Sequence, residues 1–158
     1  MELQSDLSKK YIADALILLM KQQDYSKITN KDITNKAGLS HITIYRNFKC
    51  KEDILKYYLA SLFDDWNKNW SEEHNIVFNI FTFFQNNSEI INLLYKAKQE
   101  YLLIDNILSY CDYKDEDISI IAYSKVSVAY LIFGWCTEWY KRGMVETPLE
   151  MSILFEQS

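Results

Sequence analysis

The sequence has little glycine or proline, with only 3 Gly and 1 Pro among 158 residues. Sandwiches and barrels built from many short strands need such residues at their turns. Because 49% of the residues are hydrophobic, the chain has enough apolar material for a packed core, and its composition is not that of a disordered protein. We therefore predict an all-α protein.

Cysteine and histidine are also scarce. The three cysteines, Cys50, Cys111 and Cys136, are odd in number and widely spaced, which suits reduced thiols better than disulfides or a zinc site. With only His41 and His74 available, a histidine-based metal site has few ligands to use. The sequence shows no nucleophile beside a base and no glycine-rich phosphate loop, so we expect no enzymatic activity, no metal and no cofactor.

The N-terminal residues do not have the pattern of a signal peptide. The apolar stretch Ala13–Met20 contains Asp14 and is too short to cross a bilayer. A longer apolar segment at 118–142 is interrupted by Lys125 and Glu138. We expect a cytoplasmic protein that makes no membrane contact.

Charge is unevenly distributed along the chain. The net charge of −5 alone would argue against a nucleic-acid partner. Residues 1–60, however, hold 10 Lys and Arg against 7 Asp and Glu, a net +3, and the remainder holds 7 against 15, a net −8. The two parts are therefore expected to have different partners, although chance clustering on solvated faces would give the same imbalance.

The basic part contains the signals of several short helices. Apolar residues at helical spacing predict an amphipathic helix over Ser8–Gln22. Thr29 and Asp32 form a capping-box pattern that starts a second helix, and Gly38 ends it. A third helix is expected over His41–Asn47, capped by Ser40. Two short helices joined by a glycine-containing turn are typical of a helix-turn-helix.

The run from residue 28 to residue 55 carries a dense set of diagnostic positions. They are Thr29, Ile33, Ala37, Gly38, Ser40, Thr43, Tyr45, Phe48, Lys51, Glu52 and Leu55. With these residues the segment resembles the DNA-binding domain of the TetR family of bacterial transcriptional regulators, whose pattern is T...I...AGVS.GT.Y.YF.SKE.L. Ile42 departs from the usual Gly of that pattern, and Cys50 departs from the usual Ser or Asn.

The resemblance implies two domains and a DNA partner. Residues 1–50 would form a three-helix DNA-binding domain with a helix-turn-helix, and residues 51–158 a helical ligand-binding and dimerisation domain. The partner would be a double-stranded, palindromic DNA operator bound by a homodimer. A solvated surface role for Arg46 and a core role for Tyr45 remain open alternatives. The residues expected to contact phosphates or base edges are Thr29, Ser40, His41, Ile42, Thr43, Tyr45, Arg46, Lys49 and Lys51.

The acidic part predicts further helices. One is expected from Glu52 to Trp70 and another over Ser71–Phe84. The segment 118–142 is apolar around nearly its whole circumference, which predicts burial against a second subunit. A capping box with Pro148 at the first helical position opens a final helix, and the last two helices resemble the TetR dimer interface. The expected interface residues are Ile121, Val128, Ile132, Trp135, Trp139, Leu149 and Ile153.

Aromatic residues make up 15% of the chain, more than a core of this size needs. Some of them are candidates for a ligand pocket, although aromatic residues at helical spacing more often belong to the core. The candidates are Trp66, Phe78, Phe81, Tyr95, Tyr101 and Tyr123. Taken with these features, the resemblance implies a transcriptional repressor that a small hydrophobic or cationic effector releases from DNA. The alternative is a ligand-binding or protein-interaction helical module with a vestigial DNA-binding head.

Overall fold

The structure is a computed structural model, and it describes residues 2–68 and 75–158. Every regular element within these ranges is a helix and none is a strand, which confirms the predicted all-α class. The α-helices are α1 (Glu2–Met20), α2 (Asn30–Ala37), α3 (His41–Asn47), α4 (Lys51–Lys68), α5 (Ile76–Asn86), α6 (Ser88–Ala97), α7 (Leu103–Tyr110), α8 (Ser119–Lys141) and α9 (Pro148–Glu156). Two short 3-10 helices, η1 (Tyr25–Lys27) and η2 (Glu100–Leu102), lie between them.

Several helix boundaries follow the capping signals in the sequence. α3 spans the predicted residues, and α9 begins at Pro148, directly after a Thr147 cap that forms the expected capping box with Glu150. α8 lies within one residue of the predicted segment at each end. Strong local signals therefore placed these elements correctly.

The start of α5 differs from the prediction. α5 begins at Ile76, because the side chain of Asn75 accepts a hydrogen bond from the Phe78 amide at 2.8 Å and acts as the N-cap. The predicted helix start at Ser71 and the predicted end of the preceding helix at Trp70 lie outside the described residues.

The chain forms two compact units. The first unit contains the residues up to Asp64 together with Asn92–Glu100, and the second contains Asp65–Ile91 and Tyr101–Ser158. The division falls inside α4, whereas the sequence placed a domain boundary after residue 50. Most of α4 therefore belongs to the same unit as the N-terminal helices.

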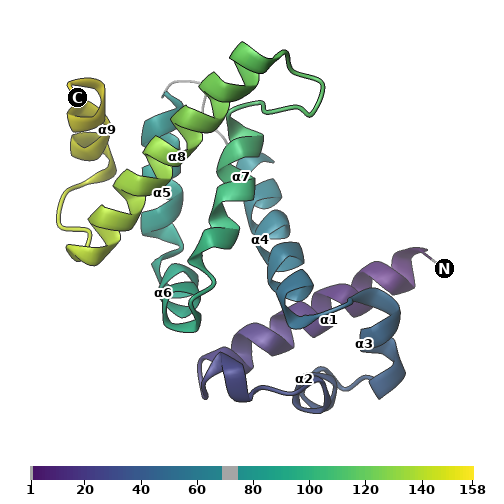
Figure 1. Cartoon of the computed structure of the whole chain (residues 1–158). Helices are drawn as coiled ribbons and strands as arrows, with labels where there is room; N and C mark the ends of the chain where they lie inside the picture. The colour runs from purple at the N-terminus through teal and green to yellow at the C-terminus, as the bar shows by residue number, and fades with distance from the viewer. Residues whose placement is uncertain (1, 69–74) are drawn as a thin grey trace. The chain divides into compact units, whose positions relative to one another are not determined.

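The first unit is built around three N-terminal helices. α1 packs against α2 and α3, and α2 also packs against α3 (Figure 1). Ile12 and Leu16 of α1, Ile33 of α2 and Ile44 of α3 are all at most 2% exposed. Burying each such side chain contributes about 1.5 to 3 kcal/mol, which holds two helices as short as α2 and α3 in place.

The second unit is organised around α5. This helix packs against α8 and α9, and α7 packs against α8 (Figure 1). Ile80, Phe81, Phe83 and Phe84 of α5 are completely buried. The ring of Phe81 meets the ring of Trp139 edge to face, with centroids 5.3 Å apart. Much of the aromatic surplus of the sequence is therefore core.

α8 has a buried apolar stripe and a second, exposed apolar face. The exposed face includes Val128, Tyr130 and Leu131. By length and composition alone α8 could also cross a membrane, and only 17% of the relevant window is buried. Lys125 within it, however, pairs with Asp117 at 2.8 Å, and α8 packs on α5 and α7. The buried stripe consists of Ala129, Ile132, Cys136 and Trp139.

Candidate nucleic-acid interface

Helix α2, which leads into the turn before α3, is fixed at both ends by hydrogen bonds. At the start of α2, the Asp32 amide donates to Thr29 Oγ1 (3.2 Å) and the Thr29 amide donates to Asp32 Oδ2 (2.9 Å), a complete capping box. At its end, Gly38 has φ +68°, and the Leu39 amide donates to the Thr34 carbonyl at 3.0 Å. Only glycine adopts this left-handed conformation without strain, so Gly38 allows the chain to turn sharply into α3.

One face of α3 is anchored and the other is open. Ile44 is buried, and so is Phe48 directly after the helix, which fixes the inner face against the unit's core. On the outer face, Ile42 is 62% exposed and Tyr45 is 60% exposed. Arg46 is also exposed, in the last turn of the helix. Large apolar and cationic side chains on a solvent-facing helix are suited to contact a partner.

Hydrogen bonds and a ring contact order the outer face of α3. Ser40 Oγ and Thr43 Oγ1 are 2.8 Å apart, and the expected capping bond from the Ser40 side chain to the helix backbone is absent. The His41 and Tyr45 rings meet edge to face at 5.2 Å, with Tyr45 Oη 3.5 Å from His41 Nε2. Asn47 Nδ2 donates to the Thr43 carbonyl at 2.8 Å. These contacts reduce the side-chain entropy that binding would otherwise cost.

Two of the expected phosphate contacts have other partners in the structure. The ammonium of Lys51 donates to the backbone carbonyls of Tyr25 (2.7 Å) and Ile28 (2.8 Å). Burial lowers the pKa of this ammonium. The hydroxyl of Thr29 donates to Asp32 Oδ2 at 2.6 Å. In the structure the Lys51 ammonium therefore binds the protein's own backbone, and its expected phosphate contact stays a prediction.

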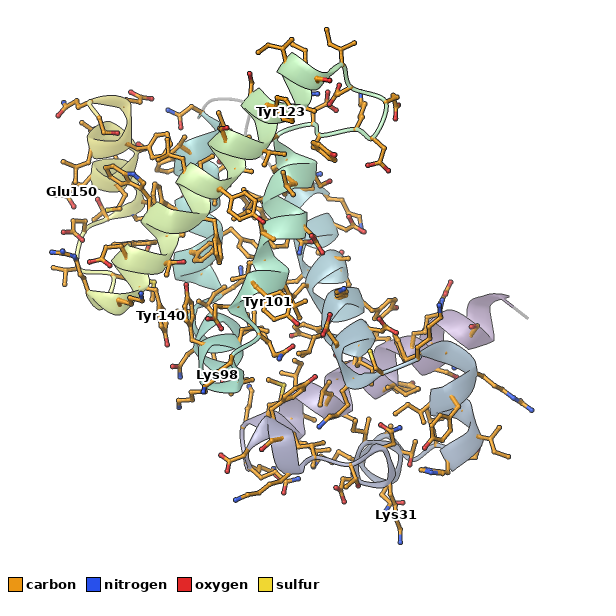
Figure 2. The ribbon with its side chains drawn as sticks, viewed as in Figure 1. Lys31, Lys98, Tyr101, Tyr123, Tyr140 and Glu150 are labelled. Atoms are coloured by element: carbon orange, nitrogen blue, oxygen red, sulfur yellow. The ribbon has the colours of Figure 1, made fainter. Side chains whose placement is uncertain are left out.

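Other cations around the helix-turn-helix are exposed. Lys49 lies in the loop after α3 with its side chain exposed, and its backbone amide donates to Asp53 Oδ2 at 3.1 Å. Lys31 projects from α2 into solvent (Figure 2), and Lys36 is exposed in the last turn of the same helix. Lys31 and Lys36 are not among the DNA contacts that the sequence predicted. Their place in the basic first 60 residues was the signal that could have identified them.

This arrangement defines the class of the first unit. Two short helices joined by a tight glycine turn, the second with an open polar, apolar and cationic face, form a helix-turn-helix of the kind that inserts its second helix into DNA. Residues 12–58 match the family model described as bacterial regulatory proteins, tetR family. The N-terminal segment is therefore similar to that family, in agreement with the resemblance seen in the sequence.

A relative with a similar segment is the uncharacterized HTH-type transcriptional regulator YvkB of Bacillus subtilis (strain 168). It is 38% identical over 53 residues, which cover 34% of this chain and 28% of the relative. This likeness therefore covers about a third of the chain and less than a third of the relative.

The expected ligand-binding aromatics do not gather around one cavity in the described part of the chain. Trp66 packs against Phe83 and Tyr110, with ring centroids 5.2 and 4.9 Å apart, and Phe81 is completely buried. Tyr101 and Tyr123 are exposed (Figure 2). The remaining two, Phe78 and Tyr95, are half-buried.

A cavity of about 330 Å³ lies instead beside α8 and α9. Its walls are mostly apolar, and one edge carries the ion pair between Arg142 and Glu138, 2.8 Å apart. Its size is within the range of small-molecule sites. The apolar lining includes Trp135, Trp139, Met151 and Leu154.

The expected dimer residues divide into two groups. Ile121, Val128, Leu149 and Ile153 are exposed, and Trp135 is half-buried against Phe155.

The other two expected dimer residues are buried in the protomer. Ile132 is 0% and Trp139 2% exposed, and the indole N–H of Trp139 donates to the Glu146 carbonyl at 3.2 Å. Their side chains belong to the protomer's own core, because they lie on the stripe of α8 that faces inward. This corrects the expectation that both would face a partner.

Proposed function

We propose that this protein is a homodimeric transcriptional repressor that binds a palindromic operator through α3. The observation that supports this most is the open, ordered outer face of α3, held on a helix-turn-helix whose inner face is fully packed. Such a helix enters the major groove, and its side chains contact base edges while flanking groups contact phosphates.

The side chains on this face suit different contacts. Arg46 would donate two hydrogen bonds to guanine, the commonest specific contact in the major groove. Ile42 would pack against a thymine methyl group. Lys49 and the Tyr45 hydroxyl would contact phosphates, joined by Lys31 and Lys36 of α2.

The exposed apolar faces of α8 and α9 would form the dimer. Val128 and Leu131 of α8 and Leu149 and Ile153 of α9 are all large, apolar and exposed. Large apolar side chains exposed on neighbouring turns of a helix often mark an interface. Two protomers related by a two-fold axis would place their α3 helices in major grooves about 34 to 36 Å apart.

A small hydrophobic or cationic effector would release the repressor. The cavity beside α8 and α9 has apolar walls, and the Glu138 carboxylate lies at its edge next to Arg142. An effector bound there would alter the geometry of the adjacent dimer face. It shifts the equilibrium only by as much as it prefers the state that does not match the operator.

A gel-shift assay with the gene's own upstream region tests the DNA-binding part of this proposal. We expect sequence-selective binding that resists excess random duplex, and loss of selectivity in Arg46→Ala.

Native mass spectrometry of protein purified from cells tests the dimer and any retained effector together. Absence of sequence-selective binding alongside a retained ligand would favour a ligand-binding module with a vestigial head.

A further inference from the structure

The ammonium of Lys51 lies against the backbone that leads into the helix-turn-helix. Its Nζ donates to the Tyr25 carbonyl at 2.7 Å and to the Ile28 carbonyl at 2.8 Å. It also lies 4.4 Å from the centroid of the Tyr25 ring. These groups belong to η1 and its C-cap, so the cation meets the negative end of a short helical turn.

These contacts join two points far apart in the chain. Lys51 is separated by 26 residues from Tyr25 and by 23 from Ile28. Ile28 immediately precedes the N-cap of α2, whereas Lys51 is the first residue of α4 and follows α3 by three residues of loop. One side chain therefore connects the entrance of the helix-turn-helix to its exit.

The environment of Lys51 fits a fixed role. Its aliphatic stem and ammonium are partly buried, and within residues 2–68 and 75–158 no carboxylate forms an ion pair with it. Two of its three donors are satisfied by backbone carbonyls at short distances. Releasing this ammonium to reach a phosphate would break both hydrogen bonds, and the Tyr25 carbonyl would keep only the bond from the Ile28 amide at 3.3 Å. Lys49, two residues earlier, is exposed, and its ammonium makes no such contact with any residue that the structure describes.

We propose that Lys51 is a positioning residue that sets the orientation of α3 for sequence-specific DNA recognition and does not itself contact phosphate. The proposal rests on the proposed function. It predicts that removing the ammonium reduces discrimination between sequences, because base contacts need accurate placement of α3. The number of phosphates neutralised stays the same.

The test compares Lys51→Met with its neighbour Lys49→Met. Methionine keeps most of the stem over the Tyr25 ring and removes the donors. Binding is measured by fluorescence anisotropy over a range of salt, well below the melting temperature of each variant. The two probes are a duplex selected by the wild-type protein from a random library and a scrambled duplex of equal composition.

For Lys51→Met we expect at least a tenfold loss in the ratio of selected to scrambled affinity, with the salt slope on scrambled duplex unchanged. For Lys49→Met we expect the slope to fall by about one unit and the ratio to stay near that of the wild type. A slope reduced by about one unit in Lys51→Met, with an unchanged ratio, would show a phosphate contact. Unchanged affinities in the folded variant would show a purely stabilising role. Either result overturns the proposal.

Two further variants serve if Lys51→Met does not fold, as judged by circular dichroism. Lys51→Arg keeps the charge, and Lys51→Gln keeps donors without charge. Positioning predicts an unchanged slope for both, whereas a phosphate contact predicts a lower slope for Lys51→Gln alone. If the wild-type protein shows no sequence preference, the proposed function is contradicted. If the wild type is selective and Lys51→Met is equally selective, only the positioning role is contradicted.

Discussion

The outer side chains of α3 differ in how firmly the protein holds them. The rings of His41 and Tyr45 pack edge to face, and the hydroxyls of Ser40 and Thr43 are hydrogen-bonded to each other. Arg46 is exposed at the end of the helix, and no ion pair holds it in the part of the chain that the structure describes. A side chain in this position is available for a base edge at little cost in existing contacts.

Replacing Arg46 by Ala should therefore relax specificity without unfolding the protein. Loss of a bidentate guanine contact costs about 1 to 3 kcal/mol of discrimination at one base position. Competition binding with single-base variants of a selected site measures this loss. Lys141→Ala, which removes an exposed cation from the last turn of α8 in the second unit, is the control and should leave base preference unchanged. Equal base preference in Arg46→Ala and wild type would remove Arg46 from the recognition surface.

The sequence predicted short-range contacts well and long-range ones poorly. Thr29 and Asp32 are three residues apart, so their spacing alone revealed the capping box that the structure contains. The partners of Lys51 are more than twenty residues away, and no local pattern could show that its ammonium binds backbone carbonyls. Ile132 and Trp139 were misassigned for a similar reason, because periodicity does not tell which apolar stripe of a helix faces its own protomer.

At the scale of elements, α2 depends on its caps because it is only 8 residues long and carries few apolar side chains. An isolated helix of this length is not stable in water. The capping box at its start and Gly38 at its end satisfy backbone groups that would otherwise be unpaired. The same capping box, Thr147 with Glu150, starts α9. The sequence prediction for the start of α5 did not identify Asn75 as its N-cap, because other polar residues precede it.

The capping box of α2 should make the first unit sensitive to acid. Hydrogen bonds from the Thr29 side chain and backbone hold the pKa of Asp32 below its ordinary value. A carboxylate with a lowered folded-state pKa stabilises the fold above its unfolded-state pKa, and this contribution is lost as pH falls through the folded-state value.

Urea unfolding followed by circular dichroism at several pH values tests this expectation. Asp32→Asn should be less stable than wild type near pH 6, and the difference should shrink toward pH 3 and below. Asp64→Asn, an exposed carboxylate outside the box, is the control and should show no such convergence. A constant difference between Asp32→Asn and wild type at all pH values would contradict the expectation.

Gly38 should resist substitution for a conformational reason alone. No atom lies within 4 Å of the position that a Cβ would occupy, so a side chain has room, but φ is +68°. Gly38→Ala should cost about 1 to 2 kcal/mol in the free energy of unfolding, because alanine disfavours the left-handed region. Gly38→Asn should cost less, since asparagine adopts this region more readily. Thermal unfolding compares the two, and equal melting temperatures for alanine and wild type would show that the turn can adopt another conformation.

At the scale of the whole molecule, the N-terminal part of the chain is basic and the rest is acidic. The first 60 residues have net charge +3 and the remaining residues −8. The overall charge of −5 therefore does not argue against DNA binding, because the charge near the helix-turn-helix is positive. The exposed apolar face of α8 is the second large-scale feature, and a second copy of the chain would cover it.

The proposed dimer should be sensitive to a charge placed on that face. Val128 is 44% exposed on α8, so Val128→Asp should fold normally but lose dimerisation, since an unpaired carboxylate in an apolar interface is strongly unfavourable. Sedimentation equilibrium should then give the 18.8 kDa protomer in place of a dimer. Leu18→Asp on α1, a side chain of 45% exposure, is the control and should remain dimeric. A fully dimeric Val128→Asp would exclude this face as the interface.

The central claim is that α3, presented twice by a symmetric dimer, recognises a specific DNA sequence. In vitro selection from a random duplex library tests it most directly. We expect enrichment of a two-fold symmetric site whose half-sites lie about 10 base pairs apart, or a multiple of that. With Arg46→Ala, we expect the preference for one guanine in each half-site to be lost. Failure to enrich any sequence, or enrichment of the same site by wild type and Arg46→Ala, would contradict it.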